Sequence, residues 1–71
     1  MTEEQLDNWF TYHAPTGDDQ INGYKLIRNA GRELAGVIAR WTPESADQSA
    51  AIRKVREAVM TANAAIACGG K

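Results

Sequence analysis

The stretch SADQSAAIRKVREAVMTANAAIA, residues 45–67, decides the fold class of this chain. Apolar side chains recur along it at helical spacing, on a stripe formed by Ile52, Val55, Val59, Ala62 and Ile66. Ser45 and Gln48 have the spacing of a capping box, which satisfies the first backbone donors of a helix. Gly69 and Gly70 follow the stripe, as glycine often does where a helix ends. The pattern predicts a helix over about residues 45–67.

A second long helix is expected before it, over about residues 19–41. Its apolar stripe consists of Ile27, Ala30, Leu34, Val37 and Trp41, with Leu26 and Ile38 beside it. Pro43 stops this helix, because proline pushes the residue before it out of the helical region. Two helices of about 22 residues, each about 33 Å long, are then joined by about four residues. Equal lengths and a short link predict an antiparallel hairpin.

A short helix is expected at the N-terminal end, over about residues 3–10. Thr2 and Gln5 have the spacing of a capping box, and apolar residues follow at helical spacing. Pro15 and Gly17 mark residues 11–18 as a loop. No stretch alternates as a strand does. The sequence therefore predicts an all-α fold, with one domain over residues 1–71.

The composition indicates that one copy of the chain has a thin core. Of 71 residues 44% are hydrophobic, but twelve of these are alanine, which buries little area. Domains of this size bury only about 60% of their unfolded surface. The single cysteine excludes an internal disulfide, and with a single histidine it also excludes a zinc-finger pattern. On the second long helix the apolar stripe and its flanks together cover an arc of about 220°. Either the flanking alanines simply favour helix and lie on the surface, or they pack chain on chain. We expect the second, in a homo-oligomer.

Charge and hydropathy exclude several classes of partner. Residues 1–23 hold five acids and no Lys or Arg, whereas residues 24–71 hold all eight basic residues. A protein that coats DNA would be basic throughout its binding face, so we expect no DNA partner. No apolar run approaches the ~18 residues that span a membrane, and no signal peptide is apparent, so an intracellular protein without a membrane partner is expected. No catalytic set, metal cluster or phosphate-binding loop is apparent either. We therefore expect neither an enzyme nor a bound cofactor.

Two groups of residues remain as candidates for binding. Lys25, Arg28 and Arg32 fall within about 60° of one another on the first long helix, on a face that also carries glycine and alanine. That face is either an ordinary solvated surface or a site for an anion or partner. Tyr12 and His13 enter the loop, where an aromatic side chain can stack on a planar ligand. An aromatic beside several cations suits a nucleotide, with a ring for the base and charge for the phosphate.

Three segments together resemble a known family. FTYHAPTGDDQ, YKLIRNAGRELA and SADQSAAIRKVREAVMTANAAIA follow one another in the order and spacing found in the small phage proteins of the anti-CBASS type 2 family. The resemblance covers about residues 9–67. It implies a helical hairpin that assembles into a homohexamer and sequesters cyclic dinucleotides such as cyclic GMP-AMP without cleaving them. Some members also bind cyclic trinucleotides. The expected location is the cytoplasm of an infected bacterium, where such a sponge blocks CBASS defence.

The resemblance also implies roles for single residues. In the family a tyrosine of the N-terminal segment and a basic residue early in the first long helix clasp the bases. Tyr12 matches the tyrosine, and either Arg28 or Lys25 matches the basic residue. Arg32 is expected nearby, and His13 is expected to donate a hydrogen bond to phosphate. A second pocket, for trinucleotides, is expected around Arg53, Arg56 and Asn63.

Asn63 has a second interpretation, because a polar residue inside an alanine-rich helix can fix the register of a helix interface through a hydrogen bond. The whole chain also has an alternative interpretation. It is a small phage adaptor or anti-repressor that binds a host protein through the aromatic cluster of residues 9–13.

Overall fold

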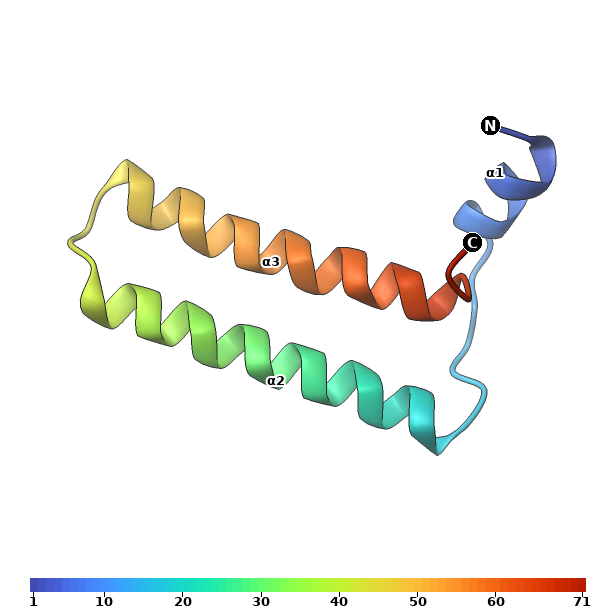
Figure 1. Ribbon diagram of the computed structural model, residues 1–71, viewed down its shortest axis with the longest axis horizontal. Helices are drawn as coiled ribbons and strands as arrows, with labels where there is room; N and C mark the ends of the chain where they lie inside the picture. Colours follow the sequence, from blue (N-terminus) through green and yellow to red (C-terminus); the bar gives the residue numbers. More distant parts are fainter.

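The computed structural model describes residues 1–71 and contains three helices and no strand. The helices are α1 (Glu3–Phe10), α2 (Asp18–Trp41) and α3 (Ala46–Ala67). The helices α2 and α3 run antiparallel side by side, and α1 lies beyond the C-terminal end of α3, next to the C-terminus (Figure 1). The all-α fold with a two-helix hairpin is therefore confirmed. The helix α2 begins one residue earlier, and α3 one residue later, than the sequence indicated.

The two capping boxes differ in the structure. At α1 the box is complete, because Gln5 N donates to Thr2 Oγ1 over 3.1 Å and Thr2 N donates to Gln5 Oε1 over 2.9 Å. At α3 only half forms, with Gln48 N donating to Ser45 Oγ over 3.1 Å. The Gln48 side chain turns the other way and donates to the carbonyls of Ala39 and Thr42. Gln48 therefore ties the start of α3 to the end of α2.

The helices α2 and α3 are in tight contact at Gly31. A Cβ added to Gly31 would overlap Cγ2 of Val59, so only a glycine fits between the two helices at this point. The half-buried side of α2 follows from this crossing and includes Gln20, Gly23, Tyr24, Ile27, Gly31, Ala35 and Ile38. The expected α3 stripe is half-buried at all of its positions: Ile52, Val55, Val59, Ala62 and Ile66.

The expected stripe of α2 was wrong in its rotation. Leu26 is 70% exposed, Leu34 51% and Trp41 79%, although all three were placed in or beside the core stripe. The reason is the crossing at Gly31. It turns the glycine-bearing side of α2 toward α3 and leaves the larger apolar side chains on one flank.

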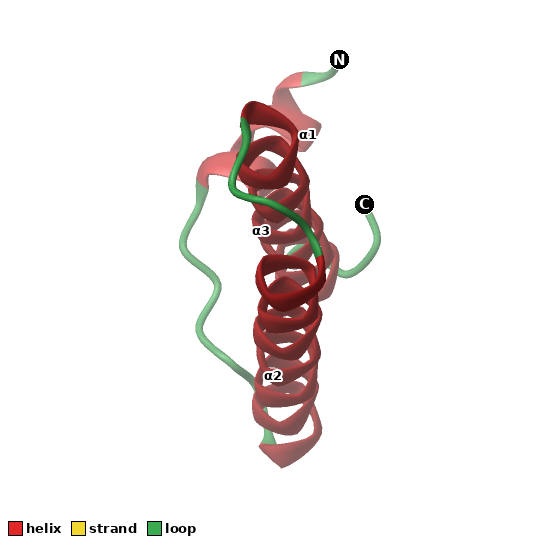
Figure 2. Cartoon of the chain, turned by 90° about the vertical axis from the view of Figure 1, so that its left-hand side faces the viewer, coloured by secondary structure: helices red, strands yellow, loops and turns green.

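The hairpin is a slab rather than a ball, and no residue in it is fully buried. Its extents are 44 × 30 × 15 Å, and Figure 2 shows how thin it is when viewed along the long axis. The radius of gyration is 15.1 Å, whereas a compact chain of this length has about 11 Å. The expectation of a thin core is thus confirmed for one chain. None of the three helices combines the length and the hydropathy that a membrane crossing requires.

Candidate functional site

The cations of α2 lie on one flank of the hairpin. At 100° per residue, Arg28 lies about 60° from Gly31 around the helix axis, Arg32 about 100° and Lys25 about 120°, all in the same rotational sense. All three side chains are exposed. They therefore stand beside the line where α2 meets α3, on its solvent side.

The helix α3 adds cations to the same side. Measured from Val59, Arg56 lies about 60° and Arg53 about 120° around the axis of α3, in the rotational sense used for α2. In an antiparallel pair, flanks with the same rotational sense lie on the same side. We call this side the cationic face, and it consists of Lys25, Arg28, Arg32, Arg53 and Arg56. No acidic residue of α2 or α3 falls within these arcs.

The opposite side of the hairpin is apolar. We call it the apolar face, and it consists of Leu26, Ala30, Leu34, Val37, Trp41, Ala51, Ala58 and Ala65. A groove of about 490 Å³ runs between the two helices here, and Ala30, Leu34 and Ala58 are among its lining residues. One charged side chain, Lys54, also lines this groove.

Small residues leave the backbone of α2 accessible next to the cations. Nη1 of Arg32 lies 3.0 Å from the position that a Cβ on Gly36 would occupy, so the guanidinium rests over bare backbone. A groove of about 600 Å³ follows there along Arg32, Ala35, Gly36, Ala39 and Arg40. An anion in this groove would lie within reach of the guanidinium groups of Arg32 and Arg40. The combination of cations with small residues, noted in the sequence, thus forms a real depression.

The linker between α1 and α2 carries the candidate aromatic. Tyr12 is 85% exposed and makes no hydrogen bond within the chain. In Figure 2 this linker bows out to one side of the hairpin, and the last residues of the chain lie on the other. Its neighbour His13 is half-buried, with Nε2 2.7 Å from the carbonyl oxygen of Asn8. That bond competes with the expected role of His13 as a donor to phosphate.

A single chain does not close a pocket around the predicted residues. None of the principal cavities is lined by Tyr12, Lys25 or Arg28. Arg53 and Arg56 share a groove of about 360 Å³ on the outer side of α3. No group of three His, Cys, Asp or Glu side chains comes together as a metal site would require.

Within one chain, Asn63 does not make the hydrogen bond across a helix interface that the sequence suggested. Its Oδ1 is buried and has no partner. A buried acceptor without a donor is destabilising by about 1–3 kcal/mol. Within a single chain, Asn63 therefore does not fix the register of the hairpin through a hydrogen bond.

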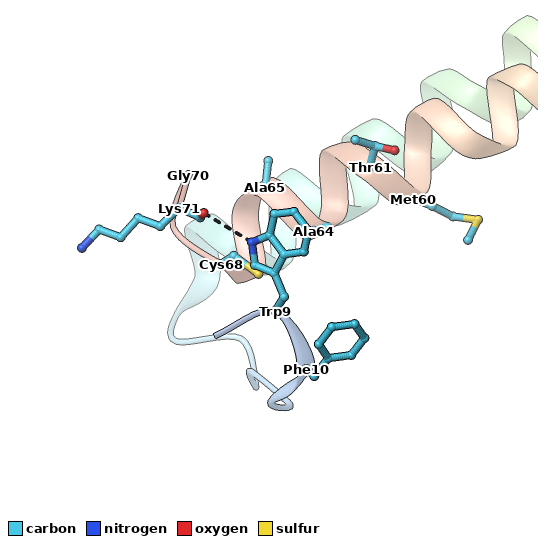
Figure 3. Close-up of a pocket in the computed structure, with 9 residues that line it drawn as sticks. All are labelled: Trp9, Phe10, Met60, Thr61, Ala64, Ala65, Cys68, Gly70 and Lys71. Carbon is cyan, nitrogen blue, oxygen red and sulfur yellow. Dashed lines mark hydrogen bonds between the residues drawn. The ribbon is translucent and has the colours of Figure 1, made fainter. Parts of the chain in front are cut away.

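Trp9 was expected from the sequence to anchor α1 onto the hairpin, but the hydrogen bonds that do so, and the part of Asn8 in them, were not foreseen. Nδ2 of Asn8 donates to the carbonyl of Cys68, and Nε1 of Trp9 donates to the carbonyl of Lys71, each over 3.3 Å. Trp9 and Phe10 border a cleft of about 570 Å³ against the end of α3 (Figure 3). No spacing rule links residues some 60 positions apart, so only the fold reveals these bonds.

Comparison with known proteins gives one match. The family model described as the Acb2/Tad1 hairpin domain matches residues 2–67, nearly the whole chain. No curated protein and no solved structure matched the chain. This is the family of the anti-CBASS type 2 and Tad1 sponges, which sequester cyclic oligonucleotides and are binding proteins rather than enzymes. With its helical hairpin and its match over residues 2–67, the chain belongs to the Acb2/Tad1 hairpin family.

Proposed function

We propose that this protein is a non-catalytic sponge for cyclic dinucleotide messengers such as cyclic GMP-AMP. By lowering the free messenger in the cytoplasm of an infected bacterium, it keeps the CBASS effector from being switched on. The observation that carries the proposal is the family match over residues 2–67. The exposed Tyr12 and the cationic face supply the chemistry that such a ligand requires.

Tyr12 is the residue proposed to stack on a base. Stacking of a base on an aromatic ring contributes about 1–3 kcal/mol, and it needs a ring with an open face. Tyr12 has such a face, because its side chain is 85% exposed. Arg28, with Lys25 and Arg32 beside it, is proposed to contact the second base or the phosphates. Hydrogen bonds from guanidinium to phosphate are charge-assisted and geometrically specific.

The proposed pocket is shared between copies of the chain. One chain exposes 5820 Å² of surface, whereas a compact monomer of 7.8 kDa exposes about 4,400 Å². The excess of about 1,400 Å² is more than the ~800 Å² that each partner contributes to a standard interface. The apolar face supplies the surface for such contacts, and a homohexamer is the assembly proposed. Tyr12 of one copy then meets the cationic face of another.

A second pocket for cyclic trinucleotides is proposed around Arg53, Arg56 and Asn63. Arg53 and Arg56 lie in the arc that belongs to the cationic face, and the Oδ1 atom of Asn63 still lacks a donor. An exocyclic amine of a base or a group from a second chain would satisfy that oxygen.

Isothermal titration calorimetry against a panel of cyclic di- and trinucleotides tests the proposal. The Tyr12→Ala variant should lose dinucleotide binding by about tenfold or more, since a stacking contribution of about 1–3 kcal/mol disappears. Tyr12→Phe keeps the ring and should bind within about threefold of the parent. Arg28→Gln should also bind weakly, whereas Lys71→Gln, which removes a cation outside the cationic face, should bind like the parent. Full-strength binding by Tyr12→Ala would move the site elsewhere.

The adaptor interpretation keeps one supporting observation, which is that Phe10 is 83% exposed beside the half-exposed Trp9. Native mass spectrometry of the purified protein separates the two functions. Nucleotide that is retained on the assembly favours the sponge, and a host protein bound in fixed ratio favours the adaptor.

A further inference from the structure

The last turn of α1 is closed by side chains from the linker. The final carbonyls of a helix have no partner within it, and here neither glycine nor a basic residue serves them. Thr11 Oγ1 donates to the carbonyl of Asp7 over 2.5 Å, and His13 Nε2 lies 2.7 Å from the carbonyl of Asn8. A carbonyl oxygen can only accept, so Nε2 of His13 carries the proton.

These two bonds lie on either side of Tyr12. The backbone is extended at Thr11, with φ −97° and ψ 138°. Thr11 and His13 both reach back to α1, so the Tyr12 side chain between them points away from α1, in keeping with its high exposure.

The helix α1 is in turn fastened to the hairpin. Asn8, whose carbonyl accepts from His13, donates through Nδ2 to the carbonyl of Cys68 at the end of α3. The indole of Trp9 donates to the carbonyl of Lys71, which is the bond drawn in Figure 3. A continuous path of contacts therefore runs from the end of α3 through α1 to the linker.

We infer that Thr11 and His13 are positioning residues that hold Tyr12 ready for the nucleotide without touching the nucleotide themselves. This inference rests on the proposed function, in which Tyr12 stacks on a base. Ordering the linker before binding removes an entropic cost that binding would otherwise include. With Nε2–H directed at Asn8, a neutral His13 ring offers only the acceptor Nδ1, which cannot donate to phosphate.

Calorimetry with cyclic GMP-AMP on four linker variants tests this inference. Thr11→Val and His13→Phe each remove one of the two bonds, and each should weaken binding about tenfold, as expected for freeing about one residue of backbone. His13→Gln places an amide donor near the position of Nε2 and should restore binding to within about threefold. Thr16→Val is the matched control for Thr11→Val, because the Thr16 hydroxyl makes no hydrogen bond; it should bind like the parent. Circular dichroism and native mass should be the same for all four variants.

The outcomes separate this inference from the proposed function. Binding at full strength by both Thr11→Val and His13→Phe, while Tyr12→Ala fails to bind, would overturn the positioning role alone. Full binding by Tyr12→Ala would overturn the site itself. Equal loss in His13→Phe and His13→Gln would make His13 a direct ligand contact and so contradict the inference. If His13→Phe unfolds, Thr11→Val still decides.

A spectroscopic measurement checks the same point without a variant. The chain has one histidine, so the ¹⁵N signals of its imidazole are unambiguous. They should show a protonated Nε2 and a bare Nδ1, and this pattern should persist when cyclic GMP-AMP is added. A switch of the proton to Nδ1 on binding would contradict the positioning role.

Discussion

At the scale of single residues, the position that shapes the hairpin is a glycine. At Gly31 the side chain of Val59 lies against the backbone of α2, and this contact turns the glycine-bearing side of α2 toward α3. Gly31 carries no apolar side chain, so an analysis of apolar periodicity passes over it. Periodicity nevertheless placed Lys25, Arg28 and Arg32 together, because the relative positions of side chains on one helix depend only on their spacing in the sequence.

Replacing that glycine tests the crossing. Gly31→Ala should lower the free energy of unfolding by about 1–2 kcal/mol, because overpacking against Val59 outweighs a gain in helix propensity of about 1 kcal/mol. Gly23→Ala is the matched control, since its Cβ would lie at an ordinary 3.5 Å from Cδ1 of Ile66. It should be neutral or stabilising. Thermal unfolding at one fixed protein concentration measures both, and an equal response of the two variants would place the crossing elsewhere.

At the scale of elements, local signals in the sequence predicted the helices well. Capping residues and proline act within one or two turns, so the bounds of α1, α2 and α3 follow from residues such as Thr2, Pro43 and Ser45. The rotation of α2 about its axis could not be predicted in this way, because its apolar arc is broad enough for more than one side of the helix to face α3. The docking of α1 depends on Asn8 and Cys68, which are distant in sequence, and no local rule reaches that far.

The N-cap of α3 gives a prediction at this scale. Ser45→Ala removes the acceptor for Gln48 N and should lower the free energy of unfolding by about 1 kcal/mol. Ser45→Asp keeps an acceptor at the same place and should lie within a few tenths of a kcal/mol of the parent. Urea unfolding followed by circular dichroism compares the two variants. If alanine and aspartate were equally tolerated, the start of α3 would be held by Gln48 and not by its cap.

At the scale of the whole molecule, the hairpin separates two kinds of surface. The cationic face carries Lys and Arg side chains, with Glu57 at the groove that Arg53 and Arg56 share, and the apolar face carries exposed Leu, Val, Trp and Ala side chains. A monomer rarely exposes so much contiguous hydrophobic surface unless something binds it. The alanine content of the sequence led to the expectation of a homo-oligomer, which stays a prediction. The proposed site could not be predicted as a whole, because a pocket shared between chains would depend on how the copies are arranged.

Assembly through the apolar face can be tested with one charge. Leu34 lines the groove of that face and is half-exposed, so Leu34→Glu should place repelling carboxylates in the interface and lower the native mass toward that of a monomer. Asn29→Glu puts the same charge on the outer side of α2 and should leave the mass unchanged. Native mass spectrometry measures both variants. An unchanged assembly for Leu34→Glu would mean that the copies meet through another surface.

The most direct measurement for the sponge is the fate of a nucleotide that it has bound. The protein is incubated with cyclic GMP-AMP and separated from free ligand. It is then denatured, and the released nucleotide is identified by chromatography and mass spectrometry. A sponge should retain the cyclic nucleotide and release it intact, in a fixed ratio to the assembly. Recovery of linear product, or retention of no nucleotide at all, would contradict it.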